Sequence, residues 1–76
     1  MKQAEVDFVV EQGLNILPIE VKSNLSSAKL EANMIGFIKR YNPPKALIVN
    51  LGYQGKRKIG KTEIFFIYPF EIADYV

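Results

Sequence analysis

The chain has 76 residues, which is enough for one domain that buries only about 60% of the surface its unfolded form exposes. Hydrophobic residues make up 49% of the chain and charged residues 24%, a globular rather than a disordered composition. Because cysteine and histidine are absent, disulfides, thiolate nucleophiles, the usual zinc sites and histidine-based triads are excluded, so any catalysis must use carboxylates, lysines, hydroxyls or a hard metal ion.

Neither net charge nor hydropathy alone indicates nucleic acid or a membrane. The net charge of +2 is small, so only a local basic cluster would indicate nucleic acid. No apolar stretch approaches the roughly 18 residues of a membrane span, and the first residues lead into a strand pattern rather than a signal-peptide core. We therefore expect a cytoplasmic protein without membrane contact.

The beginning of the chain has the alternation of two strands. Residues 5–11 place apolar and acidic side chains on opposite faces, and residues 16–22 alternate again after Gly13. The spacing predicts an antiparallel pair joined by a turn at residues 12–14.

A helix is predicted next. Residues 23–27 offer several N-caps, and apolar residues then recur at helical spacing while charged residues, Glu31 among them, are expected to face away. The pattern predicts an amphipathic helix of about four turns that must end at Asn42, because two prolines follow. The apolar positions are Leu30, Met34, Phe37, Ile38 and Tyr41.

The remaining segments complete an α/β fold. Residues 46–51 are almost entirely apolar, as in a strand covered on both faces, and a right-handed crossover would make it parallel to the strand that carries Lys22. Residues 52–61 predict a solvated loop or loose hairpin, residues 62–68 a further strand and residues 70–76 a short helical turn. The predicted fold is a small mixed sheet with a β-hairpin, one crossover helix, a parallel strand and a further C-terminal strand.

Two carboxylates and a lysine are predicted to converge on the hairpin. For the hairpin turns that fit this sequence, the residue numbers of two directly opposed residues add up to an odd number. This register places Asp7 on the same face of the hairpin as Glu20 and Lys22. Close carboxylates repel unless a cation lies between them, so Asp7 and Glu20 are candidate Mg²⁺ ligands. Lys22 could then position water for phosphodiester hydrolysis. Charged residues that simply form the solvent face of a strand explain the spacing equally well.

Three segments carry a resemblance to a known family. They are residues 4–10, AEVDFVV; residues 16–23, ILPIEVKS; and residues 36–43, GFIKRYNP, with the strand that follows. Over nearly its whole length the chain resembles the C-terminal uncharacterised domain of prokaryotic AAA-type ATPases, which is similar to PD-(D/E)xK phosphodiesterases. The resemblance implies a single restriction-endonuclease-like domain over residues 1–76, with Asp7 as the strand aspartate and Glu20 and Lys22 as the Glu-x-Lys pair.

The chain also departs from that pattern. The nuclease core normally begins with a helix and one more strand, and both would precede Met1, so we expect an N-terminally truncated fragment. The strand at residues 5–11 would then be an exposed edge, which favours pairing of two chains into a homodimer. The resemblance implies an ATPase module as a further partner.

A basic segment near the end of the chain has two interpretations. Residues 55–62, GKRKIGKT, fit the P-loop pattern, but the next six residues favour a strand where a P-loop requires a helix, so the context argues against nucleotide binding. Its cations could instead contact a nucleic-acid backbone, with a solubilising turn as the plainer alternative. The candidates are Lys56, Arg57, Lys58 and Lys61.

Two functions stay open from the sequence. The first, slightly favoured because the N-terminal nuclease elements are missing, is a nuclease-like accessory domain beside an ATPase that acts without catalysis. The second is a Mg²⁺-dependent phosphodiesterase acting on DNA or RNA. Metal binding separates the two.

Overall fold

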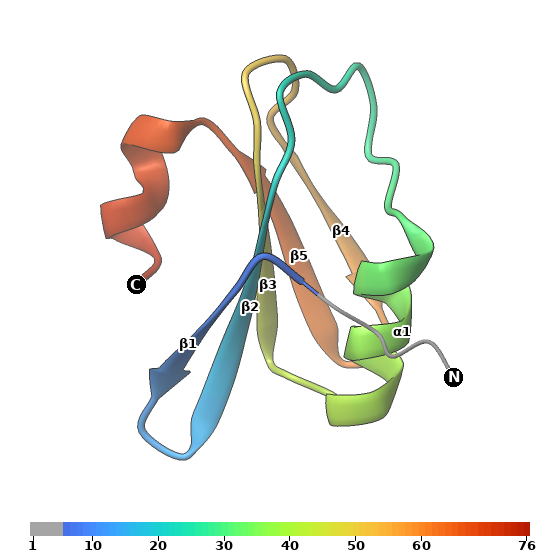
Figure 1. Cartoon of the computed structure of the whole chain (residues 1–76), viewed down its shortest axis with the longest axis vertical. Helices are drawn as coiled ribbons and strands as arrows, with labels where there is room; N and C mark the ends of the chain where they lie inside the picture. The colour runs from blue at the N-terminus through green and yellow to red at the C-terminus, as the bar shows by residue number, and fades with distance from the viewer. Residues whose placement is uncertain (1–5) are drawn as a thin grey trace.

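The computed structural model describes residues 6–76 and contains one five-stranded mixed sheet with a helix on each face (Figure 1). The elements are β1 (Phe8–Gln12), β2 (Asn15–Val21), α1 (Ala32–Tyr41), β3 (Lys45–Val49), β4 (Gly55–Ile59), β5 (Thr62–Ile67) and the 3-10 helix η1 (Pro69–Asp74). The strand order is β1-β2-β3-β5-β4, and β3 pairs in parallel with both β2 and β5. This confirms the predicted α/β class.

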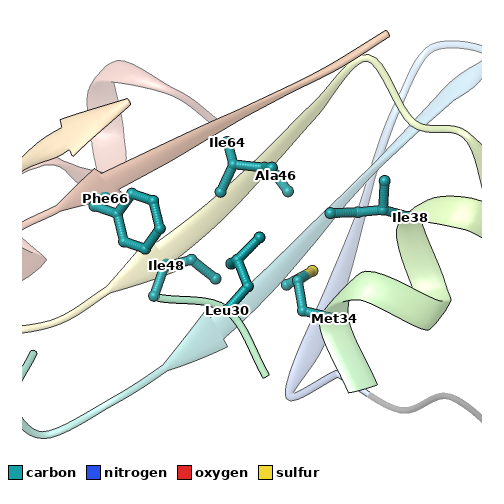
Figure 2. Packing of buried hydrophobic residues seen from close by; sticks show 7 residues of the cluster. All are labelled: Leu30, Met34, Ile38, Ala46, Ile48, Ile64 and Phe66. Atoms are coloured by element: carbon teal, nitrogen blue, oxygen red, sulfur yellow. The ribbon is translucent and has the colours of Figure 1, made fainter. Parts of the chain in front are cut away.

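Strand alternation divides the core between the two faces of the sheet. On the α1 side, Figure 2 shows side chains of the helix and the segment before it packed against side chains of β3 and β5: Leu30, Met34, Ile38, Ala46, Ile48, Ile64 and Phe66. The opposite face buries Leu17, Ile19, Leu47, Val49 and Ile67, with Ile72 and Tyr75 packed against them. β3 is covered on both faces, which explains the almost continuously apolar sequence from which this strand was predicted.

The first hairpin confirms the expected register. Phe8 pairs with Ile19 in an antiparallel ladder, so paired residue numbers have an odd sum, and the turn between β1 and β2 contains Gly13 with φ of 63°. That left-handed conformation favours glycine. The strand was predicted from residue 5, which lies outside the described residues, whereas β1 begins at Phe8.

The helix is shorter than predicted, because the residues proposed as caps do not begin it. Its N-cap is Glu31, and residues 22–31 run irregularly along the sheet. Leu25 and Ala28 pack against the core there, and the Ala28 carbonyl accepts a hydrogen bond from Arg57 at 2.8 Å. These tertiary contacts override the local helical pattern. The predicted end is confirmed, since Asn42 is the left-handed C-cap.

The basic segment forms strand β4, which confirms the hairpin alternative over the loop. The sequence of β4 does not alternate between apolar and polar residues. It forms a strand because it pairs in antiparallel orientation with β5, which is rich in aromatic and β-branched residues. Thr62 begins β5, is buried, and donates its hydroxyl to the Pro43 carbonyl at 2.5 Å. The geometry of a P-loop is therefore absent at residues 55–62, as the sequence context predicted.

The remaining predictions hold with small shifts at the ends. β3 ends at Val49 rather than at residue 51, and the predicted C-terminal helical turn is η1. Within residues 6–76 no helix combines the length and apolar character that crossing a membrane would take.

Candidate functional site

A pocket of about 220 Å³ lies where β2 ends, beside the irregular segment and the beginning of α1. Its apolar wall comes from four side chains packed near the helix-side core: Leu25, Leu30, Met34 and Ile48. Its polar lining consists of Glu20, Lys22, Asn24, Lys29 and Glu31. Two of the three residues proposed as a nuclease site, Glu20 and Lys22, thus line one pocket.

Glu20 is the most deeply placed polar residue of this pocket. It lies opposite Ile48 in the sheet, and its side chain is only 9% exposed. One carboxylate oxygen, Oε2, is 3.3 Å from the Lys22 ammonium, whereas the buried Oε1 has no hydrogen-bond partner. Buried polar atoms normally have partners, so Oε1 is an unsatisfied acceptor within the fold.

Lys22 lies between two carboxylates. Its ammonium donates a hydrogen bond to Glu31 and forms the ion pair with Glu20. The hydrogen bond to Glu31 raises the pKa of Lys22, burial opposes this, and Glu20 adds to the rise. Glu31 was predicted to face away from the core, and its side chain is exposed, but as the N-cap it precedes the first turn of the helix and contacts Lys22.

Asp7 lies across the hairpin from Glu20, as the register predicted. Its exposed carboxylate accepts a hydrogen bond from the Val21 amide at 2.8 Å, so it satisfies the backbone at the end of β2. Within residues 6–76 no group of three or more acidic, histidine or cysteine residues is arranged to hold a metal ion. Asp7 and Glu20 each have one oxygen engaged by a donor, and an ammonium stands beside Glu20, so this arrangement fits Mg²⁺ poorly. The magnesium site stays a prediction.

The four basic residues do not form one cluster. Lys56 and Lys58 lie opposite Phe65 and Glu63 on the η1 face of the sheet, and the Lys56 ammonium is 3.5 Å from Glu63. Arg57 alternates to the α1 face, where its guanidinium is held by the Ala28 carbonyl. Lys61 occupies the exposed β4–β5 turn. Their role in nucleic-acid binding stays a prediction.

Asn50, which the sequence did not single out, organises the loop after β3. It is 1% exposed, and its Oδ1 accepts the amides of Gly52 and Tyr53 at 2.9 and 2.7 Å. Its Nδ2 donates to the carbonyls of Tyr53 and Ile48 at 3.0 and 3.3 Å. An asparagine followed by Leu-Gly at the end of an apolar run was the available signal. The loop it fixes lies against the segment that lines the pocket, since Gly52 abuts the Leu25 backbone.

Fold and site together define a small α/β domain with a charged pocket beside the end of its second strand. The chain belongs to the family described as Domain of unknown function (DUF4143), whose model matches residues 1–72. The resemblance to an uncharacterised domain family is thereby confirmed. Comparisons with curated proteins and with solved structures gave no match.

Proposed function

We propose that the chain is a nuclease-like accessory domain that acts beside an ATPase and binds a partner without cleaving phosphodiesters. The observation that carries the proposal is the position of Lys22, whose ammonium lies between Glu20 and Glu31. A lysine that positions an attacking water must direct its ammonium at the substrate, whereas this one is engaged within the fold. The engagement of Asp7 with the Val21 amide supports the same proposal. The ATPase connection comes from the sequence resemblance.

Metal binding tests this proposal directly. Calorimetric titration of the wild type with Mg²⁺ and with Mn²⁺ is expected to show no heat of specific metal binding. A plasmid-nicking assay is expected to show no product. Asp7→Ala and Glu20→Ala are the informative variants, and Glu63→Ala is a matched control because it also removes a carboxylate paired with a lysine. Metal binding and nicking that are both lost in Asp7→Ala and Glu20→Ala, but retained in Glu63→Ala, would contradict a non-catalytic domain.

The second candidate, a Mg²⁺-dependent phosphodiesterase, is supported by the unsatisfied oxygen of Glu20. Asp7 and Glu20 would hold the ion, and the basic residues of the β4–β5 hairpin would contact the nucleic-acid backbone. If they do, affinity for DNA falls steeply with salt, and replacing Lys58 and Lys61 by glutamine weakens it for all sequences alike. Affinity that is independent of salt would exclude this backbone contact.

A homodimer formed through β1 is proposed as the assembly. β1 is an edge strand of the sheet, and its Phe8 and Val9 side chains are 60% and 48% exposed. An unpaired strand edge with exposed apolar side chains favours pairing with another strand. Sedimentation at high protein concentration is expected to show a dimer, which Val9→Lys weakens; a monomer throughout would contradict the proposal.

A further inference from the structure

The two edges of the sheet differ in how they are protected against pairing with a further strand (Figure 1). β4 carries three consecutive exposed cations, Lys56, Arg57 and Lys58, and lysines on an edge strand are a common device that discourages pairing. β1 has the sequence FVVEQ without a cation, and its Phe8 and Val9 side chains are largely exposed. β1 is therefore the edge at which another strand would pair.

The backbone of β1 directs the hydrogen-bonding groups of Val9 and Glu11 away from the sheet. The Lys22 amide donates to the Val49 carbonyl, so along β2 the even-numbered residues bond to β3 and the odd-numbered residues bond to β1. Their partners in β1 are the even-numbered residues. The N–H and C=O groups of Val9 and Glu11 thus face outward and bond to no strand of the described sheet.

Only a few registers let these outward groups pair with β1 of a second copy, and most of them have a fault. If Val9 lies opposite its own copy, Asp7 lies opposite Glu11, so carboxylates face each other directly. If Glu11 lies opposite its own copy, like charges are again opposed. If Phe8 lies opposite its own copy, the ladder requires Asp7, which precedes β1 and whose carboxylate is bonded to the Val21 amide.

The register centred on Val10 has neither fault. Val10 lies opposite its own copy, Val9 opposite Glu11 and Phe8 opposite Gln12, so all 5 residues of β1 enter the ladder and no like charges are directly opposed. Val9 and Glu11 of the two copies then exchange their outward N–H···O=C bonds. A strand that fits its own copy along its whole length favours a second copy of this chain over an unrelated strand as the partner.

We propose that two copies pair through β1 in antiparallel orientation, about a two-fold axis at Val10, and so join their sheets into one. On the η1 face, Val10 packs against the core cluster that contains Leu17 and Ile19. The contact between the two Val10 side chains joins these clusters across the interface. This inference rests on the proposed dimer through β1 and specifies which residues meet in it.

Amide hydrogen exchange of the wild-type chain tests the proposal without a substitution, so it stays decisive if a variant fails to fold. When the protein concentration is raised into the range where sedimentation shows the dimer, exchange of the Val9 and Glu11 amides should slow at least about tenfold, because these amides become hydrogen-bonded. Unchanged exchange at both positions in the dimer would overturn the proposal.

The same spectra contain a matched control at the opposite edge. The Glu63 amide bonds toward β3, so the even-numbered residues of β5 bond to β4, and the amides of Lys56 and Lys58 also point away from the sheet. Exchange of these two amides should not change with protein concentration. Slowing there, without slowing at Val9 and Glu11, would place the pairing at β4 and overturn the proposal.

Cysteine cross-linking locates the axis, because the chain has no cysteine of its own. In a non-hydrogen-bonded antiparallel pair the Cα atoms are about 4.5 Å apart, within the range of a disulfide. Under mild oxidation, Val10→Cys should therefore form linked dimers at least about tenfold faster than Phe8→Cys or Val9→Cys, whose copies lie farther apart. Lys58→Cys at the other edge gives the background rate from collisions.

The outcomes separate this register from the dimer on which it rests. A monomer at every concentration overturns both. A dimer in which Phe8→Cys or Val9→Cys cross-links fastest overturns the axis at Val10 and leaves the dimer through β1 standing. A dimer in which Lys58→Cys cross-links fastest overturns both, because the pairing then uses β4. Fastest cross-linking of Val10→Cys, together with slowed exchange of the Val9 and Glu11 amides, is the expected result.

Discussion

Replacing Glu20 by methionine should stabilise the fold, although it removes half of an ion pair. The unpaired, buried Oε1 costs about 1–3 kcal/mol, which the substitution recovers. Loss of the Lys22 contact costs at most about 1 kcal/mol, because that ammonium is partly exposed and retains Glu31. Methionine is long and flexible enough to lie against the apolar wall of the pocket. The net effect is a stabilisation of about 1 kcal/mol, within the range found when buried ion pairs are replaced by apolar residues.

Urea denaturation followed by circular dichroism measures this change, and a thermal scan should show a midpoint about 4–8 °C higher for a domain of this size. Glu63→Met is the matched control: its carboxylate is 44% exposed, so its loss should change the free energy of unfolding by less than about 0.5 kcal/mol. Destabilisation of Glu20→Met by more than about 1 kcal/mol would refute the argument, since the contact with Lys22 would then outweigh the cost of the unpaired oxygen.

Three other predictions concern the loops and the C-terminal helix. Asn50→Ala should cost about 2–4 kcal/mol in urea denaturation, because it leaves two loop amides unpaired, and a cost below about 1 kcal/mol would contradict the bonding described. Gly52→Ala should shift the amide resonances of the pocket, because its Cβ would overlap the Leu25 carbonyl; an unchanged spectrum would show that the two segments do not touch. The hydrogen bond from the Tyr68 amide, with a smaller contribution from a glutamine side chain, lowers the pKa of Glu71 from 4.5. The ionised carboxylate therefore stabilises η1 when the pH is above the ordinary pKa of a glutamate. This stabilisation is lost as the pH falls through the lower pKa of the folded state. Near-ultraviolet circular dichroism should report the loss, and Glu71→Ala should abolish this pH dependence.

The strands of the fold were predictable because their sequences repeat with a period of two or are continuously apolar. β4 was the exception: its three central residues, Lys56, Arg57 and Lys58, give no apolar alternation, and only the partner strand β5 makes a strand of them. The beginning of α1 was mispredicted for a related reason. Leu30 fits a helical pattern, but its side chain reaches the core from an irregular segment that Arg57 holds through Ala28.

The candidate site was predictable to the extent that strand register determines it. An odd sum of paired residue numbers placed Asp7 and Glu20 on one face, and the ladder has that register. The position of Lys22 beside Glu20 was predicted too, but its pairing with Glu31 was not, because Glu31 was assigned to a helical turn that does not exist. The pocket depends on that irregular segment, so nothing in the periodicity indicated it.

The helices on the two faces of the sheet are not packed equally firmly. α1 contributes three buried residues to its side, whereas η1 has none of its own and is held by Ile72, Tyr75 and the hydrogen bond from Gln12 to the Tyr75 carbonyl. A short segment with few buried contacts detaches at a lower free energy than global unfolding requires. Amide hydrogen exchange in η1 should therefore be much faster than in β3, and proteases should first cut the chain there. Each such opening uncovers Leu17 and Leu47, which makes this face of the sheet a surface at which the otherwise folded chain could aggregate, in addition to the exposed edge at β1.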